Sequence, residues 1–78
     1  MDKVLQTGTI NIDGEEIGYT YYLRQKLASG GYVGYTRSRY DGKTFEEDDN
    51  GHGLEHALSF LRQDIKIHKS NKEEMAKK

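Results

Sequence analysis

Two stretches of the chain, residues 4–12 and 15–24, read as strands in which apolar and polar positions alternate around Asp13-Gly14. This dipeptide is typical of a two-residue β-hairpin turn, because both turn positions need a positive φ. Folding the chain about the turn pairs Ile10 with Ile17. Because side chains alternate between the two faces of a strand, the hairpin has one core face. The pattern assigns to that face Ile10, Ile12, Ile17, Tyr19, Tyr21 and Leu23.

A second hairpin is indicated by Asp41-Gly42, which separates a strand over residues 32–40 from a short return strand over residues 43–47. A two-residue turn at this position pairs Arg37 with Glu46.

The pattern of apolar and polar residues over positions 32–40 does not identify which face of this strand is buried. Val33 and Tyr35 share one face with two arginines, while Tyr32 and Tyr40 share the other. A twist or a β-bulge would relieve this conflict, and we expect it at Gly34.

The last third of the chain shows the spacing of an amphipathic helix. Leu54, Leu58, Leu61 and Ile65 recur at intervals of four, three and four residues. The pattern predicts a helix from about Leu54 to His68, followed by a charged, flexible tail over residues 69–78. The expected fold is α+β, with the order ββββα. A small antiparallel sheet of three to four strands packs on one C-terminal helix, within a single domain over residues 1–68.

Composition narrows the function classes. A chain of 78 residues has room for one modest core, whose net stability is typically about 3–5 kcal/mol. The absence of Cys excludes disulfides and thiolate metal sites. No signal peptide and no apolar run of membrane-spanning length is evident, so we expect a cytoplasmic protein without membrane contact. The net charge of −1 argues against a domain built for duplex DNA.

The only candidate for catalysis is the run His52-Gly53-Leu54-Glu55-His56, which matches the H-x-x-E-H pattern of inverted zinc peptidases. In such enzymes two helical histidines hold the metal and the glutamate acts as the general base. Here His52 lies between two glycines, ahead of the predicted helix. A third protein ligand has no evident source. We therefore expect no bound metal, no cofactor and no enzymatic activity.

Tyrosine is the most unusual component, since six of the eight aromatic residues are Tyr and all six fall within residues 19–40. Tyrosine and arginine together are favoured at the centres of protein interfaces, and they also stack on bases and contact phosphates. The acidic run Glu46–Asp49 could imitate phosphate charge toward a basic partner. The predicted partner-binding residues are Tyr22, Arg24, Tyr35, Arg37, Arg39, Glu46, Glu47, Asp48 and Asp49.

We expect the partner to be another protein. The alternative is nucleic acid, bound by the hairpin at Asp41-Gly42. A homo-oligomer is a further expectation, because one helix leaves one sheet face uncovered and sheet edges are open to pairing.

Two short resemblances bear on these alternatives. Residues 32–61, with the turn Tyr40-Asp41-Gly42-Lys43, resemble the DNA-binding domains of phage integrase arms and AP2 proteins. That resemblance implies a sheet in the major groove, with Arg37, Arg39 and Lys43 as contacts. Gly30-Gly31-Tyr32-Val33 ahead of an Ala- and Leu-containing helix resembles HicB-type antitoxins. In general character the chain is similar to small phage or mobile-element proteins that inhibit host enzymes, including anti-CRISPR proteins.

Overall fold

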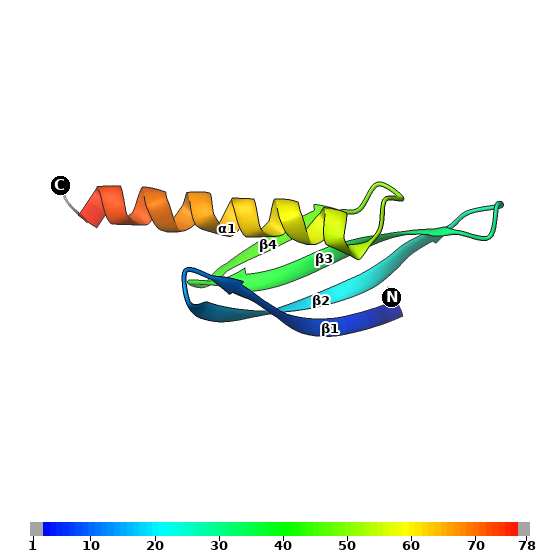
Figure 1. The fold of residues 1–78 in the computed structure, drawn as a ribbon, viewed down its shortest axis with the longest axis horizontal. Coiled ribbons are helices and arrows are strands. Elements are labelled where there is room, and N and C mark those ends of the chain that lie inside the picture. Colours follow the sequence, from blue (N-terminus) through cyan, green and yellow to red (C-terminus); the bar gives the residue numbers. More distant parts are fainter. Residues whose placement is uncertain (1–2, 77–78) are drawn as a thin grey trace.

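The computed structural model describes residues 3–76 and confirms the ββββα fold. The four strands form one antiparallel sheet in the order β1-β2-β3-β4, and a single helix follows them (Figure 1). The elements are β1 (Lys3–Ile12), β2 (Glu15–Lys26), β3 (Tyr32–Tyr40), β4 (Lys43–Asp48) and α1 (Leu54–Ala76).

Both Asp-Gly turns form as predicted. Asp13 and Asp41 have φ values of 53° and 54°, and the glycine after each also has a positive φ. These are the backbone angles that a type I′ hairpin turn requires. The predicted register follows from them, because Ile10 pairs with Ile17 and Arg37 pairs with Glu46.

The predicted irregularity near Gly34 is present, but the extra residue belongs to β2. Leu23 pairs with Gly34 and Gln25 pairs with Val33, so that Arg24 is inserted in β2 at this level. A second irregularity lies between Val4 and Gln6 in β1. A β-bulge of this kind increases the local twist of its strand and leaves the extra residue unpaired.

The buried face of β3 is made of small residues, which explains why hydrophobic alternation could not identify it. Thr36 and Ser38 are 0% and 3% exposed. The hydroxyl of Thr36 donates to the carbonyl of Glu47 at 3.2 Å, and that of Ser38 donates to the carbonyl of Gly18 at 2.6 Å. Their polar atoms are thereby satisfied, as burial requires.

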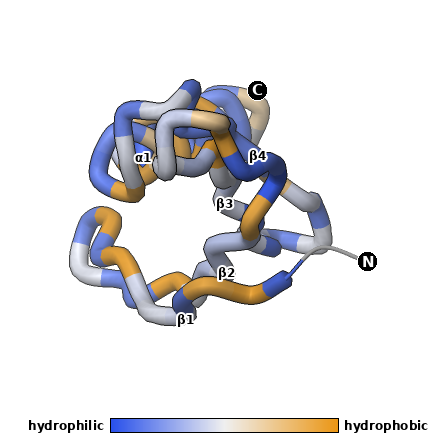
Figure 2. The backbone as a smooth tube through the Cα atoms, turned by 90° about the vertical axis from the view of Figure 1, so that its right-hand side faces the viewer, coloured by the Kyte–Doolittle hydropathy of each residue, from blue (hydrophilic) through white to orange (hydrophobic). Residues whose placement is uncertain are grey.

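The core lies between the sheet and α1. Viewed along the long axis, the sheet curls from β4 round to β1, with α1 on its inner side (Figure 2). The helix contacts β3, β4 and β1. The predicted core face of the first hairpin, except Leu23, meets the helical stripe here, and Leu23 is half-buried outside the cluster. The buried cluster consists of Ile10, Ile12, Ile17, Tyr19, Tyr21, Phe45, Leu58, Leu61 and Ile65.

The helix continues well beyond the predicted end at His68 and reaches Ala76. Its second half is held by the two hairpin turns. The ammonium of Lys72 lies 2.8 Å from a carboxylate oxygen of Asp41, and Nε2 of His68 lies 3.2 Å from the other. Lys69 lies 3.8 Å from Asp13. These tertiary partners explain why a charged segment without an apolar stripe is helical. Within residues 3–76, no helix has both the length and the apolar character to cross a membrane.

Candidate functional site

One face of the sheet packs on α1, and no element within residues 3–76 covers the other, which we call the open face. Cross-strand pairing arranges its side chains in rows across all four strands, because directly paired residues point to the same side. One row consists of Val4, Tyr22, Tyr35 and Asp48, and the next consists of Thr7, Thr20, Arg37 and Glu46.

Two tyrosines stack at the middle of the open face. The ring centroids of Tyr22 and Tyr35 are 5.0 Å apart with an interplanar angle of 20°. The guanidinium of Arg24 covers Tyr35 at 4.6 Å from the ring centroid, and that of Arg37 lies 5.4 Å from Tyr22. Tyr35 is consequently only 5% exposed, although no helix lies over it.

Each arginine of this group is also paired with an acid from β4. Nε and Nη2 of Arg37 both donate to one oxygen of Glu46, at 3.1 and 3.0 Å. Nε of Arg24 lies 2.7 Å from Oδ1 of Asp48. Hydrogen bonding and the charge of Glu46 raise the pKa of Arg37 above its ordinary value. We call the six residues Tyr22, Arg24, Tyr35, Arg37, Glu46 and Asp48 the Tyr–Arg cluster.

The Tyr–Arg cluster is electrically balanced and assembled before any partner arrives. Two arginines face two carboxylates. A stacked aromatic pair contributes about 0.5–1.5 kcal/mol beyond burial, and an exposed cation–π contact about 0.5–1 kcal/mol. The ion pairs at the surface contribute little, because solvent screens exposed charges. The side chains therefore hold one another in place, which reduces the entropy lost when a partner binds.

A shallow groove of about 270 Å³ adjoins the cluster on the open face. Arg37 and Arg39 line it together with Thr7, Gly18 and Thr20. Gly18 pairs with Thr9 and leaves this part of the sheet without a side chain of its own. The groove thus places Arg39, another predicted binding residue, next to the cluster.

The acidic run Glu46–Asp49 does not form one acidic surface, contrary to expectation. Glu46 and Asp48 are part of the Tyr–Arg cluster, whereas Asp49 is 0% exposed. The carboxylate of Asp49 accepts hydrogen bonds from the hydroxyl of Tyr21 and from the backbone N–H groups of Gly34, at 3.1 Å, and Gly51, at 2.8 Å. Because side chains alternate along β4 and the chain then turns inward, four consecutive acids point in different directions.

These contacts of Asp49 explain its protonation state. Burial alone would raise the pKa of Asp49, but the hydrogen bonds from Tyr21, Gly51 and Gly34 outweigh it and lower the pKa. Burial and the neighbouring carboxylate raise the pKa of the Tyr21 hydroxyl above its ordinary value. Asp49 is therefore a charged structural residue that joins the end of β4 to β2 and β3. Its role could not be read from the sequence, in which it ends a run of surface-like acids.

Glu47 points to the other side of β4 and meets Asp64 of α1. Hydrogen bonding to Asp64, followed by burial and the charge of Asp64, raises the pKa of Glu47 to about 7. Two carboxyl groups that share a site favour retention of one proton between them. This pair joins sheet and helix and lies apart from the open face.

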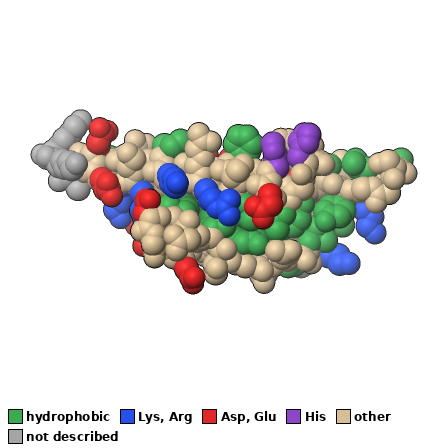
Figure 3. Space-filling model, viewed as in Figure 1, with side chains coloured by type: hydrophobic (Ala, Val, Ile, Leu, Met, Phe, Trp, Pro, Cys, Tyr) green, Lys and Arg blue, Asp and Glu red, His purple; other side chains and the backbone are tan. Residues whose placement is uncertain are grey.

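The histidines of the H-x-x-E-H run lie at the surface near the start of α1 (Figure 3). The rings of His52 and His56 are 4.9 Å apart between centroids, and His56 packs edge-on against Phe60. Across residues 3–76, no group of three or more His, Cys, Asp or Glu residues is placed to hold a metal ion.

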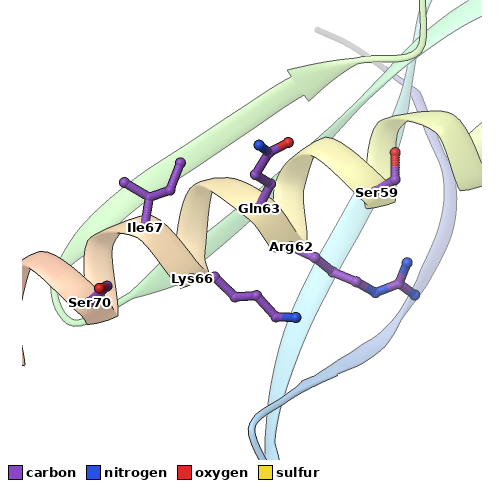
Figure 4. A pocket seen from close by; sticks show the side chains of 6 residues that line it. All are labelled: Ser59, Arg62, Gln63, Lys66, Ile67 and Ser70. Atoms are coloured by element: carbon purple, nitrogen blue, oxygen red, sulfur yellow. The ribbon is translucent and has the colours of Figure 1, made fainter.

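A larger depression of about 470 Å³ runs along the outer side of α1. Figure 4 shows that all of its labelled side chains come from this one helix, including Arg62, Lys66 and Ile67. A surface lined by a single helix has no opposing wall to enclose a ligand. Of the hollows described, the groove beside the Tyr–Arg cluster is the one that joins predicted binding residues.

The structure thus gathers Tyr22, Arg24, Tyr35, Arg37, Glu46 and Asp48 into one cluster, with Arg39 beside it, and separates Glu47 and Asp49 from it. Comparison of the chain with family models, with curated proteins and with solved structures found no match in any of the three.

Proposed function

We propose that this protein is a non-enzymatic binding protein that acts through protein–protein contacts made by the open face of its sheet. The observation that carries the proposal is the Tyr–Arg cluster, in which the Tyr22–Tyr35 stack is flanked by two arginines on a sheet face that α1 leaves uncovered. Tyrosine and arginine are the residue types most often responsible for interface affinity.

Charge balance favours a protein partner over nucleic acid. Binding to a phosphate backbone draws its affinity from unpaired positive charges, whereas Arg24 and Arg37 are each paired with a carboxylate of β4. A protein surface that offers both an apolar contact for Tyr22 and polar groups for the rim suits this balanced cluster better.

The absence of enzymatic activity is part of the proposal, and the perturbed carboxyl groups support it. Strongly shifted pKa values often mark catalytic sites. Here the shift of Asp49 follows from its role in joining three segments of backbone, and that of Glu47 from its contact with the helix. Neither group faces the groove on the open face.

Stoichiometric inhibition of a host enzyme, in the manner of small phage and mobile-element proteins, is the mode of action that we propose for this surface. A preassembled cluster on a small rigid sheet can cover part of a larger protein. This element of the proposal rests on the general character of the chain.

The test is a comparison of pull-downs from the source cell, analysed by mass spectrometry with and without nuclease. The bait variants are Tyr22→Ala and Arg37→Ala. The matched control is Gln63→Ala on the outer side of α1, where the residue is exposed. We expect a nuclease-resistant protein that the wild type and the control retain and that both open-face variants lose. Equal capture by all four baits would refute the open face as the binding surface.

Nucleic-acid binding is the second candidate, and the position of Arg39 favours it. Arg39 is exposed, lines the groove beside Arg37 and lies near the turn at Asp41-Gly42. A mobility-shift assay at low salt tests it. Retarded DNA or RNA whose affinity falls steeply with salt, and weakens further in Arg39→Ala, would support this candidate. No retardation at any tested concentration would eliminate it.

A further inference from the structure

The two edges of the sheet differ in how well they are protected against pairing. β4 has only six residues, four of them charged, and α1 contacts it more extensively than it contacts β1. β1 has ten residues without proline, and Lys3 is its only charged residue. Natural proteins blunt exposed edges with charges, prolines, bulges or short strands. Apart from the irregularity near Val4, β1 has none of these devices.

The backbone of β1 is suited to accept another strand along most of its length. Residues opposite one another in an antiparallel ladder alternate between pairs that exchange hydrogen bonds and pairs that do not. A two-residue turn starts this alternation with the pair Ile12 and Glu15. Thr9 and Asn11 therefore direct their backbone N–H and C=O groups away from β2. No strand lies on that side within residues 3–76.

Charge is distributed unevenly along the hairpin of β1 and β2. At its open end, Lys3 and Lys26 are, within residues 3–76, the only charged residues that line a pocket of about 260 Å³. Its closed end carries three exposed acids, Asp13, Glu15 and Glu16. Lys69 is the cation that faces this end from α1, at 3.8 Å from Asp13, and it balances only one of the three acids.

We propose that β1 pairs antiparallel with β1 of a second copy of this chain and forms a continuous eight-stranded sheet. Antiparallel pairing places the basic open end of each hairpin beside the acidic closed end of the other. A register centred near Gly8 brings Lys3 of one copy level with Asp13 of the other. A parallel arrangement would instead bring like charges together, which is unfavourable across strands.

This arrangement is independent of the proposed binding function and compatible with it. The Tyr–Arg cluster involves β2, β3 and β4, so pairing through β1 leaves both clusters uncovered. The symmetric contact is isologous, since each copy offers the same strand to the other. A dimer would therefore present two binding surfaces on one extended sheet.

Sedimentation velocity over a range of concentrations tests the proposal with two charge-reversed variants. One carries Lys3→Glu and Lys26→Glu, which makes both ends of the hairpin acidic. The other carries Asp13→Asn, Glu15→Lys and Glu16→Lys, which makes both ends basic, and asparagine tolerates the positive φ of residue 13. Lys43→Glu is the control, because it reverses a lysine at the opposite edge of the sheet.

We expect the wild type and the control to double in apparent mass as concentration rises. Each of the two charge variants alone should remain monomeric, because equal charges meet at both ends of the pairing. An equimolar mixture of the two should dimerise, because every basic end then meets an acidic one. High salt should weaken this rescue, since exposed charges are screened.

Thr9→Pro provides a second measurement that does not depend on charge. Proline is tolerated on an edge strand where its missing N–H would face solvent, and circular dichroism verifies that the variant folds. A folded, monomeric Thr9→Pro variant supports pairing through β1. The proposal is overturned if the wild type stays monomeric at every concentration, or if the two charge variants dimerise alone as well as they do together.

Discussion

Two tyrosine rings lie over glycines on the face of the sheet that packs against α1. A Cβ atom placed on Gly8 would lie 2.7 Å from the hydroxyl oxygen of Tyr19, and one placed on Gly34 would lie 2.6 Å from a ring carbon of Tyr21. Aromatic side chains often cover strand glycines in this way. The lack of a side chain at Gly34 lets the Tyr21 ring lie directly over the backbone. In this position the Tyr21 hydroxyl donates a hydrogen bond to Asp49, which also accepts one from the Gly34 N–H.

Gly34→Ala is expected to destabilise the protein by about 1–3 kcal/mol, which is typical of forcing an extra group into a packed site. The added methyl group would push the Tyr21 ring away from Asp49. Urea denaturation followed by circular dichroism measures the loss.

Gly31→Ala is the control for this prediction, because its nearest neighbour beyond the adjoining residues would be a methyl of Leu27 at 3.8 Å. Its free energy of unfolding should stay within about 0.5 kcal/mol of wild type, as is usual for surface substitutions. Equal losses in the two variants would show that contact with Tyr21 is not the cause.

Between elements, the contact of β4 with α1 includes the carboxyl pair of Glu47 and Asp64. The pKa of Glu47 is raised to about 7 in the folded protein, against an ordinary value of 4.5. The folded state therefore binds more protons than the unfolded state between these values, and stability falls as pH rises through this window. The favourable contribution is complete below about pH 4.5 and is lost above about pH 7.

Asp64→Asn is expected to remove this pH dependence, because the amide can donate to Glu47 and no longer carries a charge. At pH 8 the variant should be about 1–2 kcal/mol more stable than wild type, after allowance for partial exposure of the pair to solvent. Thermal unfolding at several pH values measures the difference.

The matched control is Glu73→Gln, which neutralises an exposed acid of the same helix. The free energy of unfolding of this variant should fall between pH 5 and pH 7 by as much as that of the wild type. If Asp64→Asn keeps that fall as well, the carboxyl pair is not its source.

At the scale of the whole molecule, a thin curled sheet depends on one long helix for its core. Leu61 and Ile65 are 0% exposed at the centre of this contact. The same helix reaches both hairpin turns, through Asp41 at one and Asp13 at the other. The total stability expected for a core of this size is only about 3–5 kcal/mol, so single core side chains account for much of it.

Leu61→Ala is expected to cost about 2–5 kcal/mol, as in other buried leucine truncations. Because that loss is comparable with the whole stability, a large fraction of the variant should be unfolded at 25 °C. Circular dichroism and urea titration measure that fraction. Ile67→Ala, at a side chain 52% exposed on the outer side of α1, should remain folded. A Leu61→Ala variant as stable as wild type would contradict this view of the core.

Sequence patterns correctly predicted the features that depend only on residues close together in the chain. The two Asp-Gly turns, the registers that they impose and the helical stripe of Leu54, Leu58, Leu61 and Ile65 are short-range features, and the structure confirms them. The period-two rule also placed Tyr22 and Arg24 on the outer face of the first hairpin. It grouped Tyr35 with Arg37 but left open which face of residues 32–40 is buried, and it could not show that Tyr22 and Tyr35 stack.

Residues whose roles depend on contacts across the fold required the tertiary structure. The buried face of β3 consists of Gly34, Thr36 and Ser38, which carry no hydrophobic signal, and their burial follows from the Tyr21 ring and from cross-strand hydrogen bonds. The four acids of residues 46–49 lie in three environments, namely the Tyr–Arg cluster, the contact with Asp64 and the buried position of Asp49. They are separated because neighbouring side chains on a strand point in opposite directions.

The order of elements, the two turns and the core stripe follow from the sequence alone, because backbone angles and side-chain periodicity act over a few residues. The burial of particular acids, the length of α1 and the contacts between tyrosines and arginines arise only in the folded chain. Each of these depends on a partner far away in the chain, such as Asp49 for Tyr21 or Asp41 for Lys72. The open face and the unprotected edge of β1 are products of that same packing, since one helix can cover only one side of the sheet.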